Sequence, residues 1–224
     1  MVSKLEAHLN RLIDRYPKLI VCRNDIMAAF ELLDTAYNNG RKLLVCGNGG
    51  SASDSEHIVG ELMKEFKLKR KVYNEQAAAL MAIDPELGQV LADNLQGALP
   101  AISLTGHSSL QTAFMNDAVP ELVFAQQVNG YGKPGDVFLG ISTSGNSKNV
   151  LYAAVNAKAK GLKVIGLTGL KENKLMKYAD VCIQVPETET YKIQELHLPV
   201  YHCLCLMLED HFFGHTNITD NTEK

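Results

Sequence analysis

Apolar residues recur at helical spacing through the first 40 residues of the chain, which predicts two amphipathic helices. Pro17 separates the two helices, and Asn39-Gly40 ends the second. Basic and acidic residues balance here, five against five, whereas a DNA-reading helix pair is expected to be clearly basic. The apolar positions are Leu5, Leu9, Leu12 and Ile13, then Ile26, Met27, Phe30, Leu33 and Ala36.

From residue 43 the pattern changes to short runs that are apolar at nearly every position and are followed by helical stretches. Such runs fit strands covered on both faces, and their alternation with helices predicts a parallel sheet of about five strands. The expected strands are residues 43–47, 100–106, 136–142, 163–169 and 180–186. The expected helices are residues 51–67, a stretch around 110–130, 147–160, a short one near Lys174, and 193–213.

The chain has no internal repeat and no linker rich in Gly, Ser or Pro. We therefore expect one domain over residues 1–214, with N-terminal helices at 1–40 and a doubly wound α/β core at 41–214. A length of 224 residues is compatible with this arrangement. The polar segment 215–224 is expected to be disordered.

Charge and composition exclude several classes of function. The net charge of −3, from 22 basic and 25 acidic residues, provides no basic field for nucleic acid. No segment has the length of apolar chain that a membrane span or a secretory signal needs, so we expect neither. The five cysteines are scattered and form no CxxC motif. We expect reduced thiols in the cytoplasm rather than a disulfide framework or a zinc knuckle.

Residues 47–50, Gly-Asn-Gly-Gly, end the first predicted strand and precede a helix. Glycine backbone at a helix N-terminus presents unpaired N–H groups to a phosphate or a sugar oxygen. The string also fits a loose dinucleotide fingerprint, but the acidic strand end expected about 20 residues further on is missing, since residues 65–72 read EFKLKRKV. Turn glycines without a ligand are a second alternative.

A second polar loop, STSGNS at residues 142–147, follows another predicted strand and precedes another helix. Its hydroxyls can donate to phosphate oxygens while the helix N-terminus supplies N–H groups. An ordinary N-cap cluster is the alternative. The loop lacks a P-loop lysine, which argues against a nucleoside triphosphate with magnesium. Two such loops on neighbouring strands predict a small phosphorylated ligand at the switch point of the sheet.

His57 and Glu61 lie four residues apart on the helix after the first loop. They therefore share one face, about 6 Å apart along the axis. This spacing makes them candidates for a metal-ligand pair or for a base and its partner, with a solvated surface contact as the usual alternative.

The last predicted helix carries Gln194, Glu195, His197 and His202 in an apolar stripe. A buried histidine in such a helix is more often a core residue than a ligand. Pro199 removes the backbone hydrogen bond to Glu195 and is expected to kink the helix. Two further residues, Cys203 and Cys205, lie about 200° apart around the helix and are expected to be core thiols.

These strings together resemble the SIS (sugar isomerase) domain family. They are most similar to its phosphoheptose isomerase branch, which converts sedoheptulose 7-phosphate to D-glycero-D-manno-heptose 7-phosphate. GNGGS with STSGNS is typical of SIS domains, and HxxxE with QxxxxxxxH is typical of the isomerase branch. The matching segments are CGNGGSASD at 46–54, HIVGE at 57–61, ND at 116–117, GDVFLGISTSGNSKNV at 135–150, GLKVIGLTG at 161–169 and IQELHLPVYH at 193–202.

The resemblance implies a flavodoxin-like three-layer α/β/α sandwich and a homotetramer with active sites at subunit interfaces. It implies a phosphorylated sugar as ligand and zinc as cofactor, one ion per subunit. Glu61 and His202 match the catalytic acid/base pair. The matching substrate-binding residues are Asn48, Gly49, Gly50, Ser51, Asp117, Ser142, Thr143, Ser144, Ser147 and Gln194. The matching zinc ligands are His57, Glu61, Gln194 and His202.

Moving a carbonyl group between C1 and C2 of a sugar phosphate needs a base that takes a proton from carbon and an acid that transfers protons on the oxygens. It also needs a group far from the reacting carbons by which the substrate is held in place. We expect Glu61 to move the carbon-bound proton through an enediol(ate), His202 to shuttle protons on oxygen, and zinc to polarise the carbonyl. A straight helix separates Gln194 and His202 by about 12 Å, too far to share one ion. Either Gln194 precedes the regular helix, or one ligand comes from another subunit.

Two segments depart from the family pattern and border the expected site. Glu61 and Asp117 are separated by 55 residues, with an added stretch around 76–100, and Tyr191-Lys192 stands where the family has an acidic residue. A basic run before the added stretch either forms a solvated helix end or attracts an anionic sugar phosphate. The run consists of Lys64, Lys67, Lys69, Arg70 and Lys71.

Two other functions stay open. A non-catalytic SIS protein would bind a sugar phosphate or a protein partner, as a replication-initiator-associating or regulatory protein, and can lose the acid/base residues that are present here. A Rossmann oxidoreductase would bind a nicotinamide nucleotide.

Overall fold

The structure is a computed structural model that describes residues 4–214. The N-terminal segment forms α1 (Lys4–Arg15), a 3-10 helix (Pro17–Cys22) and α2 (Arg23–Asn38), which confirms the two predicted helices. Gly40 follows α2 with a φ of +64°, a conformation that glycine adopts without strain. The disorder expected for residues 215–224 lies outside the described residues.

Five parallel strands form one sheet in the order β2-β1-β3-β4-β5, which confirms the predicted α/β fold class. Leu44 of β1 pairs with Phe138 of β3, which pairs with Val164 of β4. The strand order reverses at β1 and β3, so the loops after these two strands meet at the switch point. The strands are β1 (Leu43–Cys46), β2 (Ala101–Ser103), β3 (Val137–Ile141), β4 (Lys163–Gly169) and β5 (Val181–Val185).

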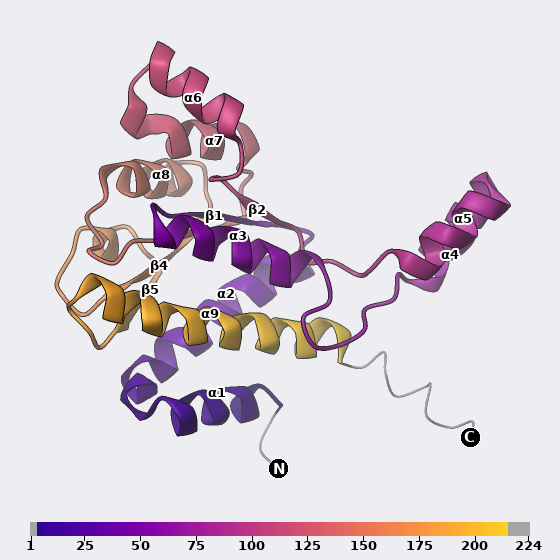
Figure 1. Ribbon diagram of the computed structural model, residues 1–224, viewed down its shortest axis with the longest axis horizontal. Coiled ribbons are helices and arrows are strands. Elements are labelled where there is room, and N and C mark those ends of the chain that lie inside the picture. Colours follow the sequence, from indigo (N-terminus) through magenta and orange to yellow (C-terminus); the bar gives the residue numbers. More distant parts are fainter. Residues whose placement is uncertain (1–3, 215–224) are drawn as a thin grey trace.

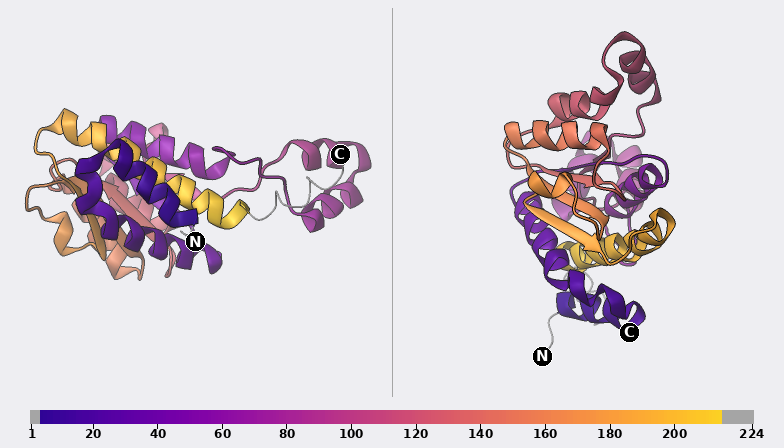
Figure 2. Two further views of the ribbon diagram at one scale, coloured as in Figure 1. Left: turned by 90° about the horizontal axis from the view of Figure 1, so that it is seen from below. Right: turned by 90° about the vertical axis from the view of Figure 1, so that its left-hand side faces the viewer.

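Successive side chains of the central strands enter two different cores, as the two-residue period of a strand requires. One core joins Val45 and Leu139 to α2, α3 (Gly50–Met63) and α9 (Thr190–Phe213). The other joins Leu44 and Phe138 to α7 (Val123–Tyr131) and α8 (Lys148–Ala159). The layers form the three-layer α/β/α sandwich seen in Figures 1 and 2.

The N-terminal helices share a core with the sheet, because Leu9, Leu19 and Ile26 are buried in the same cluster as Val45 and Leu139. The division of the chain at residue 40 stays a prediction. Helix α9 begins three residues before the predicted start and continues past Pro199 without ending. Figure 1 shows α9 as one continuous helix. Among the described residues, no helix has the length and apolar character needed to cross a membrane.

Two expected helices differ from those observed. The helix predicted to reach residue 67 ends at Met63, because Lys64 adopts an extended conformation. The stretch around 110–130 contains α6 (Ser108–Asp117), a short 3-10 helix (Pro120–Leu122) and α7. Pro120 accounts for the break, since proline cannot donate the hydrogen bond that would continue a helix.

The added stretch forms a helical hairpin that was not among the helices expected from the hydrophobic pattern. Helix α4 (Asn74–Ile83) and helix α5 (Pro85–Asn94) pack against each other, joined by Asp84. The Asp84 side chain accepts hydrogen bonds from the backbone N–H groups of Glu86 and Leu87 and so caps α5. Figures 1 and 2 show the hairpin projecting from the body of the molecule.

Arg70 and Glu209 form a fully buried ion pair that fastens the segment after α3 to α9. Arg70 Nη2 lies 2.8 Å from Glu209 Oε1, with side chains 0% and 1% exposed. The Glu209 carboxylate also accepts the backbone N–H groups of Phe66 and Lys67 at 2.9 Å. Arg70 donates to the carbonyl of Glu61. For Arg70, both interpretations of the basic run, solvation and attraction of substrate, are therefore wrong.

Replacing Arg70 with Leu should lower the free energy of unfolding by about 3–5 kcal/mol, because it leaves the Glu209 carboxylate buried without its cation. Urea unfolding at a fixed protein concentration measures the change. The double variant Arg70→Leu/Glu209→Leu is the matched comparison and should lose less than the sum of the two single variants. Additive losses would contradict the pairing.

Candidate active site

The loop between β3 and α8 is organised around its own hydroxyl groups. Ser142 Oγ and Ser147 Oγ lie 3.0 Å apart, and Ser144 Oγ accepts the backbone N–H of Asn146. Gly145 has a φ of +61°, and a Cβ there would lie 2.2 Å from Asn173, so a side chain does not fit. Thr143 and these serines lie at the N-terminus of α8, a suitable arrangement for a phosphate group.

The Gly-Asn-Gly-Gly loop lies beside this serine loop. Asn48 and Asn149 exchange two side-chain hydrogen bonds of 2.9 and 2.8 Å, which join the loop before α3 to the first turn of α8. A Cβ on Gly50 would lie 2.6 Å from Nε2 of Gln194, so the glycine makes room for the first turns of α9. The two loops and Gln194 thus meet at the carboxyl edge of the sheet.

Other loop residues shape this edge. Gly49 precedes α3 with a φ of +57° and open space where a side chain would lie. Ser51 is buried in the first turn of α3, where its carbonyl accepts the hydroxyl of Ser55. Gly49 therefore leaves backbone accessible to a ligand, whereas Ser51 lies at the base of the loop.

A second polar group lies further along α3, where this helix packs on α9. His57 and Glu61 are joined by a 3.1 Å contact between Nε2 and Oε1. The His202 ring lies edge-on to the His57 ring with centroids 4.9 Å apart. Phe66 lies 5.4 Å from the His202 ring. The structure therefore brings His57, Glu61 and His202 together, although they come from two helices distant in sequence.

Tyr201 and Asp54 orient His57. The Tyr201 hydroxyl lies 3.0 Å from His57 Nδ1 and donates to Asp54 Oδ1 at 3.2 Å. Burial, with the charge of Asp54, raises the pKa of Tyr201, so the phenol keeps its proton. With that proton directed at Asp54, the hydroxyl can only accept from His57. Nδ1 of His57 therefore carries a proton, and Nε2 faces Glu61.

Two buried polar atoms in this group have no hydrogen-bond partner: Glu61 Oε2 and His202 Nε2. The Glu61 side chain is only 11% exposed, and Lys64 Nζ lies 3.8 Å from Oε2. Burial, with the charge of His57, lowers the pKa of His202, which favours a neutral imidazole near pH 7. Buried polar atoms without partners point to a missing ligand or ion, so this contact between α3 and α9 is the candidate reaction centre.

The predicted site residues therefore fall into two groups, with one residue apart. Asp117 ends α6, is exposed and accepts a hydrogen bond from its neighbour Asn116; Figure 1 shows α6 beyond α7, away from α9. Gln194 lies within α9, so the alternative in which it precedes the regular helix is wrong. It lies about 12 Å from His202 along the helix axis and cannot share an ion with it in one copy.

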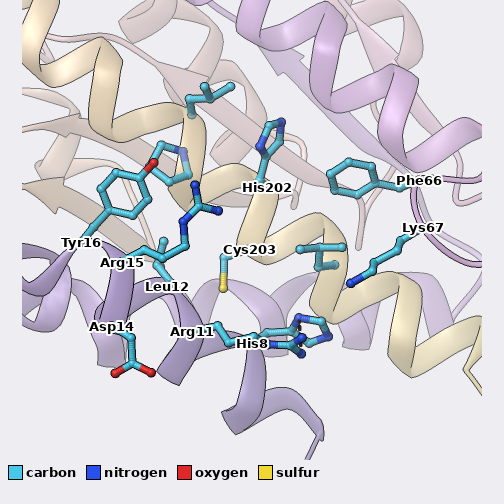
Figure 3. Close-up of a pocket in the computed structure, with 13 residues that line it drawn as sticks. His8, Arg11, Leu12, Asp14, Arg15, Tyr16, Phe66, Lys67, His202 and Cys203 are labelled. Atoms are coloured by element: carbon cyan, nitrogen blue, oxygen red, sulfur yellow. Dashed lines mark hydrogen bonds between the residues drawn. The ribbon is translucent and has the colours of Figure 1, made fainter.

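A cavity of about 530 Å³ opens on the other side of His202, between α1, α9 and the segment after α3. Figure 3 shows Arg11, Arg15 and Lys67 around it together with Phe66 and His202. Its cationic lining has the charge that attracts an anion. The basic side chains of α1 were not predicted as part of the site, because basic and acidic residues balance over residues 1–40.

Zinc would need donors from more than one place. Within residues 4–214 of one copy, no cluster of three or more His, Cys, Asp or Glu side chains is arranged to hold a metal ion. The unpartnered Glu61 Oε2 and His202 Nε2 are nevertheless atoms of the kind that bind zinc. His57 Nε2 is a third donor, and its Nδ1–H is already held by Tyr201, as is usual for a metal-bound histidine.

A family model described as the SIS domain matches residues 77–169, which include the serine loop. The fold, with its serine loop at the switch point, thus defines a protein of the SIS class. Among curated proteins, the phosphoheptose isomerase of Geotalea daltonii is 41% identical over 84% of this chain and 85% of its own length. That of Rhodospirillum rubrum is 35% identical over 94% of this chain and 98% of its own length.

Solved structures agree with this result. The phosphoheptose isomerase of Neisseria gonorrhoeae superposes with a TM-score of 0.70 at 31% identity, covering 92% of this chain and 97% of that chain. The enzyme of Francisella tularensis gives a TM-score of 0.72 at 29% identity over 92% and 97% of the two chains. The chain belongs to the phosphoheptose isomerase family, which confirms the resemblance found in the sequence.

His197 differs from His202 although both lie on α9, since it is fully buried in the core. Burial lowers its pKa to about 4, below the ordinary value of about 6.5 that it regains on unfolding. The folded state therefore excludes a proton that the unfolded state binds, and stability should fall as the pH drops from about 6.5 towards 4.

Replacing His197 with Leu should remove this component of the pH dependence. Over that window, the free energy of unfolding of the unsubstituted protein should fall more steeply than that of the variant, by up to about 1.4 kcal/mol per pH unit. Urea unfolding of both proteins at a series of pH values measures the two slopes. Equal slopes would show that His197 takes up its proton in the folded state.

Proposed function

We propose that the protein isomerises sedoheptulose 7-phosphate to D-glycero-D-manno-heptose 7-phosphate, using Glu61 and His202 as the acid/base pair. The chain is an enzyme of the phosphoheptose isomerase family. The observation that carries the assignment of residues is the group at the contact between α3 and α9, with a buried carboxylate oxygen and a buried imidazole nitrogen both unpartnered. A non-catalytic sugar-phosphate binder has no need of such groups.

Glu61 is the group that moves the carbon-bound proton. Its Oε2 is buried and carries no hydrogen bond, so it is available to take a proton from C1 of the ketose. The electron pair of the broken C–H bond forms the C1–C2 double bond of an enediol(ate), and the same carboxyl group returns the proton at C2. The carbonyl thereby moves from C2 to C1 with no net gain or loss of atoms.

His202 serves the oxygens. Its pKa is lowered chiefly by burial, so the neutral ring can accept a proton from the C1 hydroxyl and give one to the C2 oxygen. His57 does not move in this scheme, because Tyr201 and Asp54 hold its Nδ1 side. With a second proton on Nε2, the ring donates to Oε1 of the Glu61 carboxylate and leaves Oε2 for the substrate.

The two loops hold the far end of the substrate. Hydroxyls of Ser142, Thr143, Ser144 and Ser147, with the N-terminus of α8, bind the phosphate. The nearby residues Asn48, Gly49, Gly50, Ser51 and Gln194 contact the sugar chain, and Asp117 joins them from another copy. A phosphate fixed at one end gives the reacting carbons a defined position.

Zinc fits this set of donors when ligands from two copies combine. The proposed ligands are His57, Glu61 and His202, which are not arranged to hold an ion by themselves in one copy, together with Gln194 of the neighbouring copy. When bound, the ion polarises the substrate carbonyl. We further propose a homotetramer in which each site takes the acid/base pair from one copy and the serine loop from another.

The cysteines support a cytoplasmic location. All five are free, and Cys22, Cys46, Cys203 and Cys205 are buried in the cores of one copy. Burial raises the pKa of the Cys22 thiol to about 11, so this residue is an inert structural thiol. Unpaired cysteines in the core are typical of a reducing compartment.

Replacing Glu61 with Gln should leave the fold intact and lower kcat with sedoheptulose 7-phosphate by at least about 100-fold, because the amide cannot accept the carbon-bound proton. The control is Glu65→Gln, a half-buried acid beyond the end of α3, which should leave turnover unchanged. Product analysis by chromatography, with and without a chelator, measures conversion. Near-normal turnover in Glu61→Gln would remove this residue from the mechanism, and no conversion by the unsubstituted protein would favour a sugar-phosphate binding protein.

A further inference from the structure

The helical hairpin α4–α5 is the largest feature that the proposed site does not use. Both helices are ten residues long. Helix α4 has no buried residue, and α5 has one, Gly88. Helices of this length are marginal in water unless an apolar face is packed against something. A Cβ on Gly88 would lie 2.4 Å from the carbonyl of Leu80, so the hairpin is built for close contact between its helices. The structure thus specifies the hairpin but leaves its outer surface uncovered.

That outer surface is strongly apolar. Ile83 is 85% exposed, Leu87 65% and Val90 57%, and Leu91 and Leu95 are also exposed. Clustered exposed apolar side chains of this size mark a surface that another molecule covers. The hairpin also projects away from α1, as Figure 1 shows, so α1 of the same copy does not cover it.

The charge of the hairpin limits what the other molecule can be. Residues 74–99 contain four acidic residues and no Lys, Arg or His. Such a surface repels nucleic acid and anionic lipid. Two hairpins packed on each other would bring their acidic residues together at a like-charge cost. The acidic residues are Glu75, Asp84, Glu86 and Asp93.

A surface of opposite charge exists on the chain itself. Arg11 and Arg15 lie four residues apart on α1, so they share one face, and Lys67 lies across the cavity from them (Figure 3). None of these three side chains forms an ion pair with any residue of the described range 4–214. Apolar side chains line the same cavity, including Leu12 and Leu206.

The hairpin has the matching pattern on α5. Glu86, Val90 and Asp93 are four and three residues apart, which places an apolar side chain between two acids on one face of the helix. This face of α5 therefore complements the cavity beside α1, where the basic pair Arg11 and Arg15 borders an apolar surface.

We propose that the α4–α5 hairpin is an arm that docks on the Arg11–Arg15–Lys67 face of a second copy of this chain. The proposal rests on the self-association put forward above and assigns it an interface. Reciprocal exchange of arms between two copies would give a closed two-fold contact. Each arm then covers the cavity beside His202 of the other copy, so the arm also shields the reaction centre from water.

Charge reversal on the full-length chain tests the arm. Glu86→Lys/Asp93→Lys and, separately, Arg11→Glu/Arg15→Glu should each raise the dissociation constant of the oligomer about tenfold or more. The protein that combines all four substitutions should return to within about threefold of the unsubstituted value. Sedimentation velocity over a dilution series gives these constants, and circular dichroism checks that each variant keeps its helix content.

The control is Glu121→Lys, an exposed acid outside the hairpin, which should leave the constant unchanged. If each double variant associates more weakly and the combined variant does not recover the unsubstituted dissociation constant, the pairing of these two surfaces is wrong. Unchanged association in every variant, or an unsubstituted protein that is a monomer, would overturn the arm itself. Assaying sedoheptulose 7-phosphate conversion on the same samples keeps this result separate from the isomerase proposal, because association is read from mass and not from turnover.

Discussion

The packing of α3 against α9 is the contact on which the rest of the candidate site depends. Gly50 makes room for Gln194 at one end of this contact. In the middle, Tyr201 reaches from α9 to His57 and Asp54 on α3. Beyond the end of α3, Arg70 joins Glu209 of α9 to the carbonyl of Glu61. These contacts fix the register of the two helices, and the positions of Glu61 and His202 follow from it.

The same packing keeps the phosphate-binding loop and the proton-transfer residues of one copy apart. Because α9 is one continuous helix, Gln194 at the edge of the sheet and His202 at the reaction centre are about 12 Å apart along it. The phosphate loop lies at the first of these places and the proton-transfer residues at the second. A site shared between copies resolves the separation, since the serine loop of one copy then serves the acid/base pair of another. Oligomerisation is in this account a part of the chemistry.

Much of the fold could be predicted from the sequence, because buried parallel strands are apolar at nearly every position and glycine or proline marks their ends. The family motifs also located His57, Glu61 and His202, which α3 and α9 bring together. Arg70 and Tyr201 could not be found in this way. Arg70 stands in a run of lysines that looks like solvated surface, and its buried partner Glu209 is 139 residues away. Tyr201 stands in an apolar stripe, where only the approach of α3 gives its hydroxyl a role.

The hairpin was missed for a related reason. Its sequence has helical composition but no one-sided apolar pattern that a single copy can bury. Residues 76–100 were therefore expected only as an added stretch, with no element of the same chain to pack against. Local pattern predicts elements that pack within the chain. It does not show which elements pack on another copy, and that information comes only from seeing which faces of the folded chain stay uncovered.

Subunit complementation tests the shared site most directly. One variant is Glu61→Gln, and the other is Ser147→Asp, which keeps an N-cap residue on α8 but places a negative charge where the phosphate binds. Each protein alone should be inactive with sedoheptulose 7-phosphate. Mixed and reassembled in equal amounts, they should regain activity, because about a quarter of randomly assembled shared sites would contain neither substitution. No recovery in reassembled mixed oligomers would mean that each copy carries its complete site and would contradict the account.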